Sequence, residues 1–420
     1  MKKYESYKDS GVKWIGEIPG HWEVKRLGSY FIERRCKVSD KDYAPLSVTK
    51  NGIFPQLENV AKTNDGDNRK LVKRNDFVIN SRSDRKGSSG VSPLDGSVSL
   101  INIVLKPRNT IYPPYCNYLL KSLAFIEEFY RNGRGIVADL WTTRYDEMKI
   151  IKMAMPTLAE QTAIANYLDS VTSKIDEAIS QQQKMIDLLN ERKQIIIQNA
   201  VTKGLDPNAK MKDSGVEWIG EIPEDWEVKR MRYIGDAQNG LTYSPSDIVK
   251  QSNGILVLRS SNIENGRLVF KDNVYVKKCN PKFYVKKGDI IICSRNGSAS
   301  LVGKCAIVDN EIDASFGAFM MRFRSYNHNK YIYYLLTSAI SHYKQLFSTS
   351  TINQLTLSIF ANIKMPICSH YIQKDIADYL DDTTSKIDSS ISQCNKMISL
   401  LQERKQIIIN DVVTGKVKVV

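Results

Sequence analysis

The sequence has 420 residues, with 60 Lys and Arg against 46 Asp and Glu, and a formal net charge of +14. One hydrophobic core rarely extends beyond about 250–300 residues, so this length excludes a single-domain protein. A composition of 42% hydrophobic and 25% charged residues excludes the disordered class, and no apolar run reaches the ~20 residues of a membrane span. The surplus of positive charge favours an anionic partner, although solubility alone is a rival explanation.

The amino-terminal stretch and the cysteines indicate a compartment. The start, MKKYESYKDSG, has no apolar segment after its charges and does not resemble a secretory signal. Seven Cys without any C-x-x-C spacing and four scattered His make a disulfide framework or a metal centre unexpected. We therefore expect a protein of the reducing cytoplasm that holds no metal.

Two segments each occur twice in the chain. The anchor segment reads KDSGVKWIGEIPGHWEVKR at 8–26 and KDSGVEWIGEIPEDWEVKR at 212–230. The second repeat reads QTAIANYLDSVTSKIDEAISQQQKMIDLLNERKQIII at 161–197 and QKDIADYLDDTTSKIDSSISQCNKMISLLQERKQIII at 373–409. The order anchor, spacer, helix, found twice, indicates a duplicated two-part protein.

The first spacer, residues 30–157, contains short β-type runs broken by Gly, Asn, Asp and Pro, with one helix expected at Tyr115–Tyr130. The second spacer, residues 231–368, has a different sequence but the same character, with a helix expected at Tyr331–Phe347. Both patterns predict mixed α/β domains.

One stretch corresponds between the two spacers. Residues 72–82 (VKRNDFVINSR) align with residues 285–295 (VKKGDIIICSR). Each reads as a basic turn, a buried strand and a Ser-Arg pair where the strand ends, and Gly90 and Gly303 then fall at equivalent places.

A long helix is expected after each spacer. In the first copy apolar residues recur at steps of three and four from Ile164 to Leu189, the stripe of a helix that packs on a partner. Thr157 and Glu160 predict a capping box at its start, and Gly204 predicts its end. Each copy covers about 45 residues, or roughly 65–70 Å. Two nearly identical stripes predict an antiparallel coiled coil, although two independent core helices are an alternative.

The net positive charge comes entirely from the regions outside the two long-helix segments. Residues 1–150 carry 26 basic and 18 acidic side chains, and residues 211–370 carry 20 and 14. Residues 151–210 and 371–420 each carry seven of both signs. Two basic domains joined by neutral helices are suited to hold one polyanion at two places.

The order and the amino-acid sequences of these repeats resemble those of the specificity subunit of type I restriction–modification systems. The resemblance covers nearly the whole chain, with NERKQIII and QERKQIII closing the two helices. It implies that each variable domain recognises one half of a split DNA sequence. It further implies that the helices form a spacer that helps to dock two modification subunits. Those subunits use S-adenosylmethionine to methylate adenine at N6, and a third, restriction subunit supplies ATP- and Mg-dependent translocation and cleavage.

The expected fold is therefore α+β, with two α/β target-recognition domains separated by two long helices that form an antiparallel coiled coil. Its expected parts are the first domain with its anchor at 1–156, the first helix at 157–205, the second domain with its anchor at 206–368, and the second helix with the carboxyl terminus at 369–420. The chain itself is expected to be non-catalytic and to bind no cofactor.

Candidate DNA contacts are the side chains around the corresponding stretches. Arg82 and Arg295 are the leading base readers, because each follows a buried strand and Arg pairs bidentately with guanine; a structural role is the alternative. Lys73, Arg74, Lys286 and Lys287 are expected phosphate contacts. The remaining candidates are Arg85, Lys86, Ser88, Ser89, Arg131, Arg134, Arg144, Arg259, Ser260, Asn262, Asn296, Ser298 and Lys304. The anchor tryptophans are expected to pack the domains onto the helices.

Three alternatives stay open from the residues alone. One is a stand-alone DNA-binding regulator with two tandem domains. Another is the recognition subunit of a system whose methylase and nuclease share one polypeptide. The third, a self-sufficient enzyme, is disfavoured: Tyr112-Pro113-Pro114-Tyr115 lacks the Asp or Asn of the amino-methyltransferase motif, and Gly297 to Lys304 lacks the spacing of a phosphate-binding loop.

Overall fold

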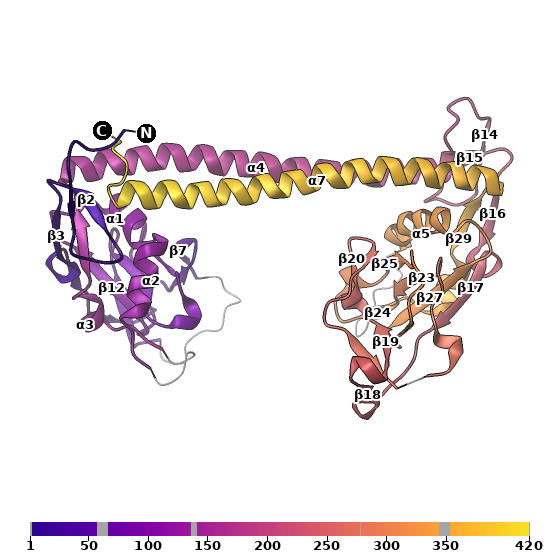
Figure 1. Ribbon diagram of the computed structural model, residues 1–420, viewed down its shortest axis with the longest axis horizontal. Helices are drawn as coiled ribbons and strands as arrows, with labels where there is room; N and C mark the ends of the chain where they lie inside the picture. Colours follow the sequence, from indigo (N-terminus) through magenta and orange to yellow (C-terminus); the bar gives the residue numbers. More distant parts are fainter. Residues whose placement is uncertain (1, 57–65, 136–140, 278, 344–352, 420) are drawn as a thin grey trace. The chain divides into compact units, whose positions relative to one another are not determined.

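The structure is a computed structural model that describes residues 2–56, 66–135, 141–277, 279–343 and 353–419. The chain forms two compact units: unit 1 comprises Met1–Gln183 and Asn395–Val420, and unit 2 comprises Lys184–Cys394. Each unit has a β-rich domain and a segment of both long helices, α4 (Leu158–Lys203) and α7 (His370–Val413) (Figure 1). The predicted α+β class with two long paired helices is confirmed, and the two domains, expected to be mixed α/β, are rich in β-strands.

The domain of unit 1 is built on a four-stranded antiparallel sheet in the order β10-β9-β12-β4. Its strands are β4 (Phe31–Glu33), β9 (Phe77–Asn80), β10 (Ser89–Val91) and β12 (Asn102–Pro107). A smaller sheet and a hairpin complete the β-rich part, with β5 (Lys37–Val38), β8 (Arg69–Val72) and β11 (Gly96–Val98), and β6 (Leu46–Thr49) and β7 (Gly52–Pro55). The helices are α1 (Pro113–Leu120), α2 (Leu123–Arg131) and α3 (Tyr145–Met148).

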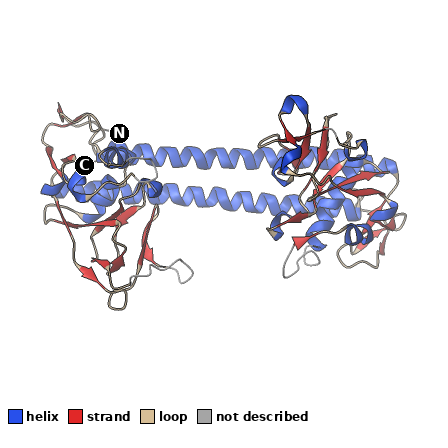
Figure 2. Cartoon of the chain, turned by 90° about the horizontal axis from the view of Figure 1, so that it is seen from below, coloured by secondary structure: helices blue, strands red, loops and turns tan. Residues whose placement is uncertain are grey.

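The domain of unit 2 contains a matching four-stranded sheet in the order β17-β27-β23-β25. Its strands are β17 (Gly235–Asn239), β23 (Ile290–Cys293), β25 (Cys305–Ile307) and β27 (Met320–Ser325). A second sheet has β18 (Ile248–Val249), β19 (Ile255–Leu258), β22 (Val274–Val276) and β26 (Ala314–Phe316). Short pairs add β20 (Ile263–Glu264), β21 (Arg267–Leu268), β24 (Arg295–Asn296) and β28 (Asn353–Gln354), and the helices are α5 (Asn329–Tyr343) and α6 (Leu357–Asn362). Figure 2 shows the strands of the two domains in red and the long helices in blue.

Both anchors form the same small elements beside the helices. In unit 1 these are β1 (Tyr7–Asp9), β2 (Glu17–Pro19) and β3 (Glu23–Arg26), and in unit 2 they are β14 (Met211–Asp213), β15 (Glu221–Pro223) and β16 (Glu227–Arg230). The third strand of each anchor pairs with the strand that leads into a long helix, β13 (Lys152–Met155) or β29 (Lys364–Ile367).

The two four-stranded sheets are counterparts in order and register. Phe77 pairs with Leu105 across β9 and β12, and Ile290 pairs with Phe323 across β23 and β27. The predicted correspondence of residues 72–82 with 285–295 is therefore present in three dimensions.

The predicted equivalence of Gly90 and Gly303 is wrong. Ser89 pairs with Ile79 and Cys305 pairs with Ile292, the counterpart of Ile79, so the counterpart of Gly303 lies two residues before Ser89, at Gly87. Both glycines have a left-handed φ, 82° at Gly87 and 85° at Gly303, which L side chains rarely adopt. The loops before them differ in length, and an alignment by a constant offset hides this.

The helix expected at Tyr115–Tyr130 is in fact two helices. α1 ends at Leu120, and Ser122 caps α2 by accepting a hydrogen bond from the Phe125 amide at 3.3 Å. A Ser at this position starts a new helix because its hydroxyl satisfies an otherwise free amide. In unit 2 the expected helix is α5, and its predicted last residues, 344–347, lie outside the described residues.

The first long helix begins and ends as the sequence predicts, and the two long helices pair as expected. The Thr157 amide donates to the Glu160 carboxylate at 3.2 Å, and the Glu160 amide donates to the Thr157 hydroxyl at 3.3 Å, which is the expected capping box. α4 ends before Gly204, whose φ is 76°. Unit 1 contains the start of α4 and the end of α7, so the helices run antiparallel.

Equivalent ion pairs join the helices in the two units. Asp176 contacts Lys405 at 2.7 Å in unit 1, and Asp388 contacts Lys193 at 2.6 Å in unit 2. Both partners of one pair are 212 residues from those of the other, so the helix pairing repeats with the sequence. Among the helices of the described chain, none combines the length and the apolar character needed to cross a membrane.

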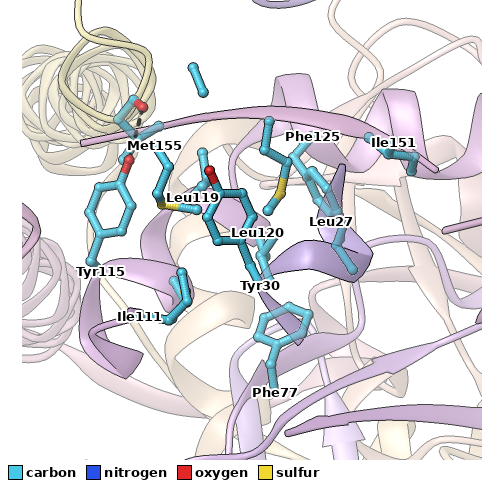
Figure 3. Close-up of a cluster of buried hydrophobic side chains, with 14 of the residues drawn as sticks. Leu27, Tyr30, Phe77, Ile111, Tyr115, Leu119, Leu120, Phe125, Ile151 and Met155 are labelled. Atoms are coloured by element: carbon cyan, nitrogen blue, oxygen red, sulfur yellow. Dashed lines mark hydrogen bonds between the residues drawn. The ribbon is translucent and has the colours of Figure 1, made fainter. Parts of the chain in front are cut away.

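Each domain is mounted on the carboxyl-terminal end of the helix that follows the other domain. In unit 1 the hydroxyl of buried Tyr115 donates to the Val413 carbonyl of α7 at 3.4 Å (Figure 3). In unit 2 the hydroxyl of Tyr331 lies 3.5 Å from the Val201 carbonyl of α4 and 3.0 Å from the Pro366 carbonyl of β29. The anchor residue Trp22 is buried in the same core cluster as Val413.

The prediction that the anchor tryptophans pack the domains onto the helices is confirmed for Trp22 and Trp226. Trp22 is 0% and Trp226 is 1% exposed, and Trp226 shares its core cluster with Val201 and Ala200 of α4. Burial of such large rings at the helix ends stabilises the mounts through the hydrophobic effect.

Candidate nucleic-acid interface

The Ser-Arg pair of unit 1 is fixed from two sides where β9 ends. The Ser81 amide donates to the Ile101 carbonyl at 3.3 Å, and the Ser81 carbonyl accepts from the Thr143 amide at 3.0 Å. Arg82 therefore has a well-defined backbone position while its side chain is exposed to solvent.

Three predicted arginines of unit 1 lie close together at this end of β9. Thr142 forms backbone bridges to both Arg82 and Arg134, and Arg144 follows two residues later. Two of them, Arg82 and Arg144, border a recess of about 610 Å³. Its other charged lining residues are Arg35, Lys37 and Lys70 and the acidic Glu33 and Asp146. Leu100 and Ile101 also line it, so the recess presents charged surface of both signs, mostly cationic, together with apolar surface.

Not all cations at this end are unpaired. The Arg134 side chain is 85% exposed and lies 3.5 Å from Glu147, whereas Arg131 contacts Glu128 at 2.9 Å within α2. Trp141 donates its indole N–H to the Tyr130 carbonyl at 2.6 Å and so packs against α2. Arg131 is thus engaged on its own helix.

The Gly-rich loop after β9 divides into exposed and buried candidates. Arg85 is 70% exposed, and Lys86 contacts Glu127 at 2.7 Å. Ser88 and Ser89 are 6% and 0% exposed, because the chain re-enters the sheet there as β10. Their side chains contribute nothing to the surface that Arg85 occupies.

The Ser-Arg pair of unit 2 is fixed in the equivalent way. The Ser294 amide donates to the Phe319 carbonyl at 3.0 Å, and the Ser294 carbonyl accepts from the Leu355 amide at 2.7 Å. Arg295 is half-buried, and its guanidinium carbon lies 5.2 Å from the centre of the Phe319 ring. Such a cation–π contact holds the guanidinium at the surface.

Polar side chains gather around Arg295. The Asn296 amide donates to the Ser260 hydroxyl at 3.4 Å, which joins the two predicted loops. Arg259 donates to the Asp272 carbonyl and is partly committed to that loop. Asn262 is fully buried and donates to the Val269 carbonyl at 3.0 Å, so its role is to hold the turn.

The remaining candidates of this loop differ in exposure. Ser298 is exposed, and its hydroxyl lies 2.8 Å from that of Ser300. Lys304 is half-buried, and its carbonyl accepts from the Cys293 amide at 2.8 Å as the chain enters β25.

The basic turn of unit 1 lies at the opposite end of β9 from Arg82. Its backbone is held by buried Asp76, which accepts the Lys73 amide at 2.8 Å and the Arg34 guanidinium at 2.6 and 3.0 Å. The hydrogen bond to Asp76 raises the pKa of Arg34. Lys73 contacts Asp95 at 2.7 Å, and that hydrogen bond raises its pKa, whereas the side chain of Arg74 is exposed.

The basic turn of unit 2 has the same construction. Buried Asp289 accepts the Lys286 amide at 2.8 Å and the Arg324 guanidinium at 2.7 Å through both oxygens. The hydrogen bond to Asp289 raises the pKa of Arg324. Lys286 and Lys287 are both exposed. The predicted residues of each domain thus form two groups, one at each end of the central strand.

Comparison with known proteins identifies the family. A family model described as the type I restriction modification DNA specificity domain matches residues 223–398. The type I restriction enzyme MjaVIII specificity subunit of Methanocaldococcus jannaschii is 27% identical over 98% of this chain and 97% of its own length. The EcoKI specificity subunit of Escherichia coli K12 is 28% identical over 47% of this chain and 44% of its own.

The chain belongs to the specificity subunits of type I restriction–modification systems. Solved structures agree on the fold. A chain from a structure concerned with complex assembly and conformational transition of the type I R-M system superposes with a TM-score of 0.73 at 14% identity, covering 95% of this chain and 99% of that one. The HsdS subunit from Thermoanaerobacter tengcongensis gives 0.52 at 15% identity, covering 95% and 98%.

A specificity subunit is the non-catalytic, DNA-recognising member of its complex. Within the described ranges of this one, no group of three or more His, Cys, Asp or Glu side chains is placed to hold a metal ion.

Sequence reasoning missed several surface residues beside the predicted ones. Arg35, Lys37 and Lys70 share the recess with Arg82, although they are more than 10 residues away in the sequence. Phe319, 59% exposed, lies beside Arg295. No local motif marks these four residues, because antiparallel pairing brings them into place. The sequence held one signal, the correspondence between the two domains. Aligning the strand at Asn102–Pro107 with the strand at Met320–Ser325 places Ile101 and Phe319, which directly precede these strands, at equivalent positions.

Proposed function

We propose that this specificity subunit reads an asymmetric bipartite DNA target, with one half-site for each recognition domain. The supporting observation is that the two domains hold an arginine at the same strand end but surround it differently. Arg82 borders a basic and apolar recess, whereas Arg295 packs on Phe319. Equivalent positions with unlike neighbours favour unlike half-sites.

In this proposal the first recognition domain with its anchor is residues 1–156 and the second is 206–368, and residues 157–205 and 369–420 form the spacer helices with the carboxyl terminus. Arg82 and Arg295 contact base edges, supported by their fixed backbones. Arg74, Lys286 and Lys287 contact phosphates, supported by their exposure at the basic turns.

The proposed protein partners are two modification subunits and the restriction subunits. Each unit presents one apolar stripe on a long helix, and the members of the two stripes are 212 residues apart. The stripes are Met185, Leu188 and Ile195 in unit 2, and Met397, Leu400 and Ile407 in unit 1, all 48–60% exposed. Positions 185, 188 and 195 share one helix face. Two like apolar surfaces on one chain favour two copies of one protein partner.

Bound in this way, the complex methylates adenine at N6 and restricts unmodified DNA. S-adenosylmethionine, ATP and Mg belong to the modification and restriction subunits, and the assembly works in the cytoplasm. Support for this part is the family membership, since specificity subunits act within such complexes.

Docking is tested by placing an aspartate in each stripe. Leu188→Asp leaves one modification subunit per chain, Leu400→Asp does the same, and the double variant binds none, because a charge in an apolar interface is costly. Gln194→Asp, an exposed position on the opposite face of α4, retains two. Native mass spectrometry of the co-purified complex gives the ratio, and two partners bound to the double variant would refute the docking surface.

The target itself is tested by mapping N6-methyladenine in host DNA with and without this chain. The expected result is one motif with two unlike half-sites and an unread gap, present only with the chain. A palindromic or continuous motif would contradict two independent readers. If the chain alone bound DNA specifically and no methylation depended on it, a stand-alone regulator would be favoured. Co-purification with a single polypeptide that carries both methylase and nuclease would favour the fused system.

A further inference from the structure

An exposed apolar residue lies beside the leading arginine in both recognition domains. In unit 2 it is Phe319, 59% exposed, immediately before β27, and in unit 1 it is Ile101, 38% exposed, immediately before β12. β12 and β27 are counterparts, so both residues occupy the same place in the fold. Single exposed apolar residues are common on protein surfaces. What distinguishes these two is that they recur at the same place, next to an arginine, in two domains that otherwise differ.

The position of Phe319 is fixed by its backbone. Its carbonyl accepts two hydrogen bonds, from the Ser294 amide at 3.0 Å and the Arg295 amide at 3.1 Å. These bonds fix the backbone of Phe319 beside Arg295. The ring centre lies 5.2 Å from the Arg295 guanidinium carbon, and more than half of the residue surface stays open to solvent. A fixed apolar group contributes to recognition without a large loss of side-chain entropy.

The chemistry around Phe319 matches the edge of a DNA major groove. The arginine offers paired donors suited to guanine, and the neighbouring Asn296 and Ser260 offer further donors and acceptors. The apolar feature of that groove is the 5-methyl group of thymine, which Phe contacts in protein–DNA complexes. Adjacent base pairs lie about 3.4 Å apart along the axis, so two side chains 5.2 Å apart can reach neighbouring pairs.

We propose that Phe319 determines specificity by packing on the 5-methyl group of a thymine next to the base pair that Arg295 contacts. Ile101 occupies the corresponding place beside Arg82 in the first domain. This inference rests on the proposed function, because it requires the second domain to read a half-site.

The experiment uses the chain assembled with its modification subunit and duplexes that carry the motif found by methylation mapping. Each thymine of the second half-site is replaced singly by deoxyuridine, which lacks only the 5-methyl group. For the wild type, one replacement weakens binding about fourfold, the factor for losing one methyl group from an apolar contact. For Phe319→Ala, the thymine duplex binds more weakly and the same replacement causes no further loss.

Two further variants separate contact from positioning. Phe319→Leu stays sensitive to the replacement, because it keeps apolar surface while losing the aromatic ring under Arg295. Tyr326→Ala, which removes an even more exposed aromatic just after the other end of β27, behaves like the wild type. Co-purification with the modification subunit confirms that each variant is folded.

Distinct outcomes overturn the inference and the proposed function. If wild-type complex binds the motif but tolerates every deoxyuridine, or if Phe319→Ala keeps the wild-type sensitivity, the thymine contact is refuted. The thymine contact would also be refuted if no deoxyuridine replacement changed binding and Phe319→Ala bent the DNA less than the wild type. The ring would then act as a wedge inserted between base pairs. If the wild type prefers no motif at all, the proposed function fails instead.

Discussion

Each recognition domain buries an aspartate at the same position, but the arginine that pairs with it comes from a different part of the sheet in the two domains. Asp76 pairs with Arg34, which directly follows β4, whereas Asp289 pairs with Arg324 in β27. By sheet register, the counterpart of Arg34 is Gln238 and the counterpart of Arg324 is Lys106. The ion pair is therefore shared although neither arginine is. Similarity between the domains lies in contacts rather than in aligned residues.

The difference has a functional side at the other end of the central strands. Both domains fix a Ser-Arg pair by equivalent backbone hydrogen bonds, yet one surrounds the arginine with a recess and the other with an aromatic ring. The comparison separates a shared frame, which sets where the arginine is, from variable side chains, which set its surroundings.

Lengthening both long helices tests whether the two domains read independently at a fixed separation. Four residues inserted after Gln182 and four after Cys394 add about 6 Å to each helix, or about two base pairs. We expect binding to the original target to fall toward the non-specific level, a loss of at least ~4 kcal/mol. Methylation mapping should show unchanged half-sites and a longer gap; an unchanged gap would exclude the helices as the spacer.

Moving the arginine within unit 1 tests the shared ion pair. Arg34→Gln leaves Asp76 buried without its cation, at a cost of about 3–5 kcal/mol. Adding Lys106→Arg places a guanidinium where unit 2 has Arg324 and should restore much of the loss. Hydrogen-exchange mass spectrometry would report lower protection in β9, with β23 of unit 2 as the internal control. Failure of the second substitution to rescue β9 would show that the two frames are not equivalent.

Removing each leading arginine tests whether the domains read separate half-sites. Arg295→Ala should cost about 1–3 kcal/mol on the cognate target and relax choice at one base of the second half-site. Arg82→Ala should do the same in the first half-site and leave the second unchanged. Binding measured on a set of single-base variants distinguishes these effects, and uniform weakening on every sequence would make the arginine a phosphate contact.

The smallest effect is expected at the basic turn of unit 2. Lys286→Ala and Lys287→Ala should each weaken binding equally on all sequences and reduce the slope of log affinity against log salt by about 1. Lys282→Ala is a matched control, since Lys282 is also exposed but lies before the turn. A base-specific effect of either turn substitution would mean that this end of β23, and not only the Arg295 end, reads sequence.

The sequence predicted well whatever depends on periodicity or local capping. The stripe from Ile164 onward, the box of Thr157 with Glu160 and the burial of Trp22 are all properties of neighbouring or repeated residues. The break at Ser122 was missed because an apolar stripe continues across it. A cap overrides that pattern locally.

What the sequence could not predict depends on pairing between distant strands. Arg34 and Asp76 are joined only once β4, β12 and β9 lie side by side. Likewise, Ser89 and Asn262 have the polarity expected of a DNA contact, yet both are buried by the return of the chain. Depth below the surface is set by tertiary structure, and spacing along the chain carries little information about it.

The mounts at the helix ends have a combinatorial consequence. Tyr115 and Tyr331 contact carbonyls at the ends of nearly identical helices, although they belong to two unlike domains. The attachment contact is therefore the same in both units, whereas the attached domains differ. Any domain that keeps this contact can be exchanged without redesigning the helices. A pool of n interchangeable domains then supplies n² ordered pairs, so new specificities can arise by shuffling whole modules rather than by altering individual contacts.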